Sequence, residues 1–95
     1  MAVTRTHHYT VDAADLPELL TRRAAVIAAV RAAHTGLAHT RLTRLEDGSF
    51  TDTWRWDSAG QMQAALAAMP IPEARAAMSL TRGATFSDGD VIDER

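Results

Sequence analysis

The sequence contains no cysteine and no asparagine, and its aromatic residues are limited to two tryptophans, two phenylalanines and one tyrosine. The absence of cysteine excludes a disulfide framework, a thiol nucleophile and a thiolate metal site. No apolar run approaches the roughly 18 residues that a membrane-spanning helix requires. Residues 1–11 also lack the apolar stretch of a signal peptide. We therefore expect a cytoplasmic protein that does not enter a membrane.

The chain also lacks a strong net charge, since ten basic and twelve acidic residues give a formal charge of −2. The basic residues are spread along the chain, which disfavours nucleic acid as a partner. A length of 95 residues is near the lower end of what a single core supports. We expect residues 1–95 to form one domain, and dimerisation would help so small a chain to bury apolar surface. The richness in Ala, Arg and Thr is typical of a GC-rich bacterial genome.

The first half of the chain predicts a strand followed by a helix. Residues 3–11 alternate and are rich in Thr and Val, which is typical of a β-strand. Asp15 is the expected N-cap of the helix, Pro17 lies in its first turn, and Gly36 is expected just after its last turn. Apolar residues at helical spacing predict its buried face: Leu16, Leu19, Leu20, Ile27 and Val30.

The second half predicts a hairpin, two helices and a last strand. Asp47-Gly48 lies between two alternating runs and is the strongest hairpin signal in the sequence. Residues 58–69 begin with a capping box, "SAGQ", and residues 73–80 form a short helix after the segment "PIP". Residues 83–87, "GATFS", are expected to form the last strand. The tail after them is either a short extension or frayed.

This order of elements, β-α-β-β-α-β, is the split βαβ arrangement of ferredoxin-like α+β domains. It predicts a four-stranded antiparallel sheet that carries both main helices on one face. The other face of the sheet would be left bare. A second copy of the chain is the expected cover, which predicts a homodimer formed through the sheet.

A two-residue turn at Asp47-Gly48 fixes the predicted pairing of the hairpin strands. It places Arg41 opposite Trp54 and His39 opposite Trp56. Both tryptophans then point to one side of the sheet, and this side should face the helices because it carries most of the apolar area. The polar side chains predicted on the same side are His7, Tyr9, His39, Arg41 and Asp52.

Polar groups that are buried without partners beneath the helices cost about 1–3 kcal/mol each. These five side chains therefore either pair with one another or line a pocket that is open to water or to a ligand. The helices that face them are rich in alanine, which leaves room for a pocket. The opposite side of the sheet is rich in threonine and is the predicted dimer face.

Several of these residues allow two interpretations. Trp54 and Trp56 either form an aromatic wall for a flat ligand or fill the core. Arg41 either makes a cation–π contact with Trp54 or anchors a phenolate or carboxylate. Asp52 either pairs with Arg41 or His39, or acts as an acid or base.

Histidine supplies the best candidates for a general base, because its unperturbed pKa of about 6.5 suits proton abstraction at neutral pH. His7 and His39 share the predicted pocket side. His7 and His8 are adjacent on a strand and point to opposite sides, so they do not form a two-ligand metal site. We expect neither a metal nor another cofactor.

The chain resembles the antibiotic-biosynthesis-monooxygenase-like family of dimeric α+β barrels. The resemblance rests on the order of elements, on Gly36-Leu37 after the first helix, on "RLEDGSFTDTWRWDS" at residues 44–58 and on "QMQAALAAMP" at residues 61–70. It covers nearly the whole chain. It is greatest to small actinobacterial members of unassigned activity.

The resemblance implies a range of activities. The family includes cofactor-independent oxygenases of phenolic polyketides, quinol oxygenases, haem-degrading enzymes and relatives that resemble cyclases or isomerases. In the oxygenases, a pocket tryptophan with polar neighbours is implied to bind and deprotonate a phenolic substrate, whose carbanion reacts with oxygen directly. Trp56 matches the tryptophan that the family commonly carries on the third strand. The absence of asparagine disfavours the Asn-dependent oxygenase and haem-degrading patterns.

We therefore predict a small cofactor-independent oxygenase, or a related enzyme, that acts on an aromatic phenolic or polyketide-like molecule in bacterial secondary metabolism. The candidate catalytic residues are His39, His7 and Asp52. The candidate substrate-binding residues are Trp54, Trp56, Arg41 and Tyr9. The alternatives are a non-catalytic binding or structural dimer, a haem-binding or haem-degrading protein, and a polyketide cyclase or isomerase.

Overall fold

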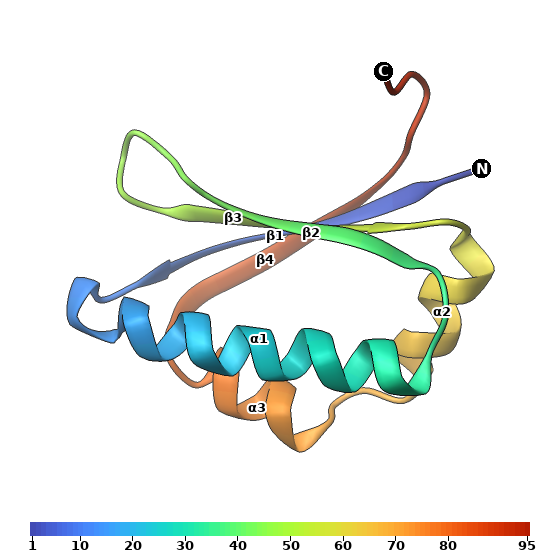
Figure 1. Ribbon diagram of the computed structural model, residues 1–95. Helices are drawn as coiled ribbons and strands as arrows, with labels where there is room; N and C mark the ends of the chain where they lie inside the picture. Colours follow the sequence, from blue (N-terminus) through green and yellow to red (C-terminus); the bar gives the residue numbers. More distant parts are fainter.

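A computed structural model describes residues 1–95 and confirms the predicted order of the elements. The strands form one antiparallel sheet in the order β2-β3-β1-β4, and the helices lie together on one face of it (Figure 1). The elements are β1 (Val3–Val11), the 3-10 turn η1 (Ala13–Asp15), α1 (Leu16–Ala33), β2 (Leu37–Arg44), β3 (Phe50–Trp56), α2 (Ala59–Ala67), α3 (Pro72–Met78) and β4 (Thr81–Asp90).

The last strand is longer than the predicted residues 83–87, because β4 pairs with β1 along most of its length. A bulge between His8 and Thr10 interrupts this pairing. A bulge breaks the alternation of side chains. The alternation in the sequence therefore predicted only residues 83–87, the middle part of the strand.

The buried face of helix α1 consists of different residues from the predicted ones. Leu19, Val26 and Val30 are buried, whereas Leu20 is 49% exposed and is not part of the core. The buried positions are spaced by seven and four residues, which is the spacing of one helix face. Arg23 lies on this same face, four residues after Leu19, and so it points toward the sheet.

The hairpin loop has three residues rather than the predicted two. The backbone N–H of Gly48 donates to the carbonyl of Leu45 at 3.0 Å, and the N–H of Leu45 donates to the carbonyl of Ser49 at 2.8 Å. Gly48 has a φ of 86°. This combination of a tight turn and a left-handed glycine is a common three-residue hairpin connection.

The extra loop residue shifts the pairing of β2 and β3 by one position. His39 now pairs with Arg55 and Arg41 with Thr53, so the predicted placement of His39 and Arg41 beneath the helices is wrong. A shift of one residue turns every side chain of a strand to the other face. In the observed register Leu42 takes the helix side, and a bulge between Leu37 and His39 keeps Leu37 on that side as well, so both leucines contribute to the core. Burial of Leu42 in place of a histidine and an arginine favours this register.

The alternation predicted for β1 is confirmed. Arg5 pairs with Trp54, His7 with Asp52 and Tyr9 with Phe50, so the odd-numbered residues of β1 face the helices. The core lies between this face and the helices. Its buried apolar residues are Val3, Tyr9, Leu19, Val26, Val30, Leu37, Phe50, Trp56, Met62, Ala65 and Ala77.

The opposite face of the sheet carries no helix (Figure 1). Thr6 and Thr53 lie on its two central strands, and their hydroxyl oxygens are 3.1 Å apart. The C-terminal tail rises on this side, where both oxygens of Glu94 accept hydrogen bonds from Arg55 at 2.7 and 2.6 Å. The backbone N–H of Val91 donates to the carbonyl of Ala2 at 2.9 Å and holds the start of the tail. None of the helices is both long and apolar enough to cross a membrane.

Candidate active site

A cavity of about 290 Å³ lies between the sheet and the helices. Twelve of its seventeen lining residues are hydrophobic, and both tryptophans are among them. The sheet contributes side chains from β1 and β3, and the cover comes from α1, α2, α3 and the segment between the last two helices. The charged or titratable residues of the lining are Arg5, His7, Tyr9, Arg23 and Asp52.

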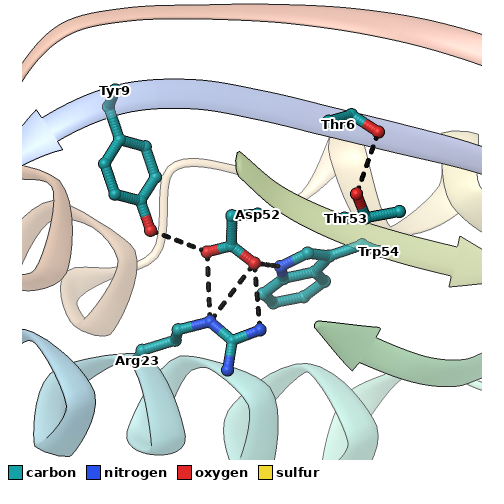
Figure 2. A network of polar contacts seen from close by, with 6 residues as sticks. All are labelled: Thr6, Tyr9, Arg23, Asp52, Thr53 and Trp54. Carbon is teal, nitrogen blue, oxygen red and sulfur yellow. Dashed lines mark hydrogen bonds and ion pairs between the residues drawn. The ribbon is translucent and has the colours of Figure 1, made fainter. Parts of the chain in front are cut away.

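Asp52 is the centre of a polar network in this cavity (Figure 2). Its Oδ2 accepts a hydrogen bond from the hydroxyl of Tyr9 at 2.9 Å, and its Oδ1 accepts one from Nε1 of Trp54 at 3.0 Å. Arg23 reaches both oxygens from α1, with Nε at 3.2 and 3.1 Å and Nη2 at 2.9 Å from Oδ1. The carboxylate is therefore fully paired, although Asp52 is only 7% exposed.

Of the two interpretations of Asp52, the structure shows an ion pair, but the two predicted partners are wrong. Its cation is Arg23, and both His39 and Arg41 are exposed on the other face of the sheet. A charged residue on the apolar stripe of a helix is the sequence signal that could have identified Arg23. The alternation of β1 could likewise have identified Arg5, which lies on the same face as His7 and Tyr9.

Tyr9 was predicted to bind the substrate, but Asp52 occupies its hydroxyl. The hydroxyl of Tyr9 donates to Asp52, so its proton is not available to a ligand. Burial, followed by the negative charge of Asp52, raises the pKa of Tyr9 well above its ordinary value of 10.0. Tyr9 therefore stays protonated at neutral pH, where it positions the carboxylate.

His7 differs from the other polar residues of the cavity because its ring nitrogens make no hydrogen bond within the chain. It is half-buried and lies opposite Asp52 on the neighbouring strand. Burial lowers its pKa from the ordinary 6.5, and the negative charge of Asp52 opposes this effect. The imidazole is therefore neutral near pH 7 and has a free nitrogen that can accept a proton.

The two tryptophans combine the two predicted roles. Trp56 is 4% exposed and belongs to the core, and it also forms part of the cavity wall. Trp54 is partly buried, and its indole is held in place by the hydrogen bond to Asp52. No group of three or more His, Asp or Glu side chains is placed where it could hold a metal ion.

The fold and this cavity define a class: a small split βαβ domain with an apolar, tryptophan-lined cavity between the sheet and the helices. Neither a protein-family model nor a curated protein matches the chain. The matches come from solved structures. They establish the fold as that of the antibiotic biosynthesis monooxygenase-like proteins, which confirms the predicted resemblance at the level of the fold.

Three of these structures illustrate the similarity. A mutant of the cofactor-independent oxygenase SnoaB of Streptomyces nogalater superposes with a TM-score of 0.79 at 24% identity, over 98% of this chain and 95% of that chain, and SnoaB without the mutation gives 0.72. The haem-degrading protein Rv3592 of Mycobacterium tuberculosis gives a TM-score of 0.77 at 23% identity, over 100% and 96%. A proposed antibiotic biosynthesis monooxygenase of Caulobacter crescentus gives 0.72 at 16% identity, over 97% and 91%.

Proposed function

We propose that this protein is a small cofactor-independent oxygenase, or a closely related enzyme, whose substrate is an aromatic phenolic or polyketide-like molecule. The observation that carries the proposal is the cavity, which combines apolar walls and two tryptophans with one unpaired basic group, His7. The similarity in fold to SnoaB, a cofactor-independent oxygenase, supports it.

The charges in the cavity favour an uncharged aromatic ligand over an anion. Arg23 is neutralised by Asp52, and Arg5 is neutralised by Asp88, with Nε and Nη2 at 2.8 and 2.9 Å from the carboxylate oxygens. No full positive charge is therefore left to recruit a carboxylate or phosphate. Flat apolar walls suit an aromatic ring, as in most small-molecule sites.

The proposed reaction starts when the neutral imidazole of His7 removes a proton from an acidic ring CH₂ of the substrate. The resulting carbanion is delocalised over the aromatic system. Nη1 of Arg23 makes no hydrogen bond within the chain, so its N–H groups can donate to the oxygen on which the negative charge develops. The carbanion then supplies both electrons for a new C–O bond to molecular oxygen. The imidazolium returns its proton to the peroxide, and loss of water converts the CH₂ carbon into a carbonyl.

Oxygen uptake with anthrone as the probe substrate, without added cofactor, tests this function. His7→Gln should reduce the rate by about 100-fold or more, since a general base contributes roughly 10²–10⁴-fold. His39→Gln is the matched control and should retain the wild-type rate, because His39 lies on the other face of the sheet. An unchanged rate in His7→Gln would show that His7 is not the base. The absence of uptake in the wild type would favour a non-catalytic binding protein.

Haem binding is the second candidate, because the free imidazole of His7 could serve as an axial ligand. The fold similarity to the haem-degrading protein Rv3592 supports it. The small volume of the cavity, about 290 Å³, and its neutralised arginines count against it. A shift of the haem Soret band on titration that is lost in His7→Gln would favour this candidate over the oxygenase.

We also propose that the protein is a homodimer formed through the helix-free face of the sheet. This face is composed largely of threonine and other polar residues, so the interface would be wetter than a typical core. Its exposed or half-buried side chains are Thr4, Thr6, His8, Thr10, His39, Arg41, Thr43, Thr51, Thr53, Arg55, Thr85 and Ser87.

A further inference from the structure

Phe86 is an exposed aromatic residue beside the cavity. It is 59% exposed, whereas the other phenylalanine, Phe50, is 5% exposed and belongs to the core. Phe86 pairs with His7 across β1 and β4, so it lies on the helix side of the sheet. A dimer formed through the opposite face would leave Phe86 uncovered.

Two residues of the cavity wall, Arg5 and His7, pack against Phe86. The guanidinium carbon of Arg5 lies 4.0 Å from the centre of the Phe86 ring, a cation–π contact. The rings of His7 and Phe86 have centroids 6.0 Å apart and are tilted by 52°. Arg5 and His7 both line the cavity. Phe86 therefore lies directly beside two residues of the cavity wall, and one of them is the proposed base, His7.

Arg5 is itself fixed in this position. Its bidentate ion pair with Asp88 uses Nε and Nη2, at 2.8 and 2.9 Å, and leaves the plane of the guanidinium against the Phe86 ring. A flexible arginine loses conformational entropy when it binds a ligand. Arg5 is already ordered by Asp88 and Phe86, so a ligand that contacts this pair meets a preformed surface.

We propose that Phe86 and Arg5 form an outer subsite, which binds the part of a polycyclic aromatic ligand that projects beyond the cavity. This inference rests on the proposed function, because it takes the cavity as the site of an aromatic ligand. The reacting carbon of the ligand lies against His7 in the proposed reaction, and the His7 ring is 6.0 Å from the ring of Phe86. A ring fused beside this carbon therefore lies close to Phe86 at the edge of the cavity, whereas a single ring has no such part. Phe86 then sets the size of the ligand that binds well.

The test compares two probes that quench tryptophan fluorescence, single-ring phenol and three-ring anthrone. Phe86→Ala should weaken the binding of anthrone about two- to tenfold, the value of one aromatic contact. It should leave the binding of phenol unchanged, because one ring fits inside the cavity. Phe86→Tyr should retain the wild-type affinity for anthrone. Leu20→Ala, which removes another exposed apolar side chain away from the cavity, should change neither affinity.

Three results would overturn the outer subsite. Equal affinity for anthrone in the wild type and Phe86→Ala would show that Phe86 does not contact the ligand. An equal loss for phenol and anthrone would assign Phe86 to the stability of the cavity. A change from dimer to monomer in Phe86→Ala, measured by sedimentation, would assign it to a protein interface. If the wild type is quenched by neither probe, the aromatic-ligand function itself fails, which is distinct from a failure of the subsite alone.

Discussion

At the scale of single residues, the carboxylate of Asp52 organises the interior of the cavity. A buried carboxylate is stable only when its charge and its lone pairs are matched, because removal from water is costly. Arg23 supplies the charge, and Tyr9 and Trp54 supply further donors. The same contacts fix the indole of Trp54 and the phenol of Tyr9, which gives the cavity walls one defined arrangement.

Breaking this ion pair should be more harmful than removing both partners. We expect Arg23→Gln to lower the free energy of unfolding by about 3–5 kcal/mol, because the buried carboxylate of Asp52 loses its cation. Arg23→Gln combined with Asp52→Asn should recover part of this loss.

Urea unfolding of both single variants and the double variant measures the coupling energy between Arg23 and Asp52. Arg31→Gln is the control, and its effect should stay within about 0.5 kcal/mol, since Arg31 is exposed on α1, away from the sheet. Strictly additive losses would contradict the network.

His7 should make both activity and stability depend on pH in the acid range. Burial holds the pKa of His7 below its ordinary value in the folded protein. As the pH falls below about 6.5, the unfolded chain takes up this proton before the folded chain does, so stability decreases. The proposed oxygenase activity should also fall, because the imidazolium cannot accept a proton.

The measurements are kcat/KM with anthrone and the free energy of unfolding, each followed from neutral to acid pH. In His7→Gln, the fall in stability between the folded and unfolded pKa values of this histidine should be absent. His39→Gln should leave the acid limb of kcat/KM in place. A His7→Gln variant whose stability falls as steeply as that of the wild type would refute the assignment.

At the scale of the elements, the loop between β2 and β3 decides which residues reach the cavity. The three-residue loop turns His39 and Arg41 away from the helices and brings Leu42 toward them, while a bulge between Leu37 and His39 keeps Leu37 on the helix side. The side chain of Asp47 supports the turn, since its Oδ1 accepts from the backbone N–H of Ser49 at 2.9 Å.

Gly48 has a backbone conformation in this loop that only glycine adopts without strain. Its φ is 86°, and an added Cβ would meet nothing within 4 Å, so the cost of Gly48→Ala is conformational alone. We expect a loss of about 1 kcal/mol in the free energy of unfolding. Gly60→Ala is the matched control, because it lies in α2 with 4.0 Å to the nearest atom, Ser58 Oγ, and should gain about 0.5–1 kcal/mol. Urea unfolding of both variants checks the opposite signs.

At the scale of the whole molecule, the sheet has one face covered by helices and one face free of them (Figure 1). The free face is crossed centrally by β1 and β3, where Thr6 and Thr53 meet. A chain of 95 residues buries a limited apolar area alone, so a second copy on this face would add stability.

A charge at the centre of the free face tests the proposed dimer. Thr6→Glu should convert the dimer to a monomer, because two like charges would meet near the two-fold axis without compensation. Thr21→Glu, on the exposed side of α1, should leave the dimer intact. Sedimentation velocity distinguishes the two states. A dimer that persists in Thr6→Glu would exclude this face as the interface.

The sequence by itself determined the order and type of the elements, the helix-facing side of β1 and the location of the hairpin turn. These features are local, because strand alternation, helix spacing and capping depend on neighbouring residues. It also placed His7, Tyr9, Asp52 and both tryptophans on the helix side of the sheet, which the structure confirms.

Only the tertiary structure decided the register of the hairpin and the partner of Asp52. Asp47-Gly48 favours a turn but is compatible with loops of two or three residues, and one residue more reverses the facing of the β2 side chains from His39 to Arg44. Arg23 and Asp52 are 29 positions apart, so their ion pair depends on how α1 packs against the sheet. Burial of Leu42 in place of His39 and Arg41 determines the register of the hairpin, and neutralisation of a buried carboxylate determines the partner of Asp52.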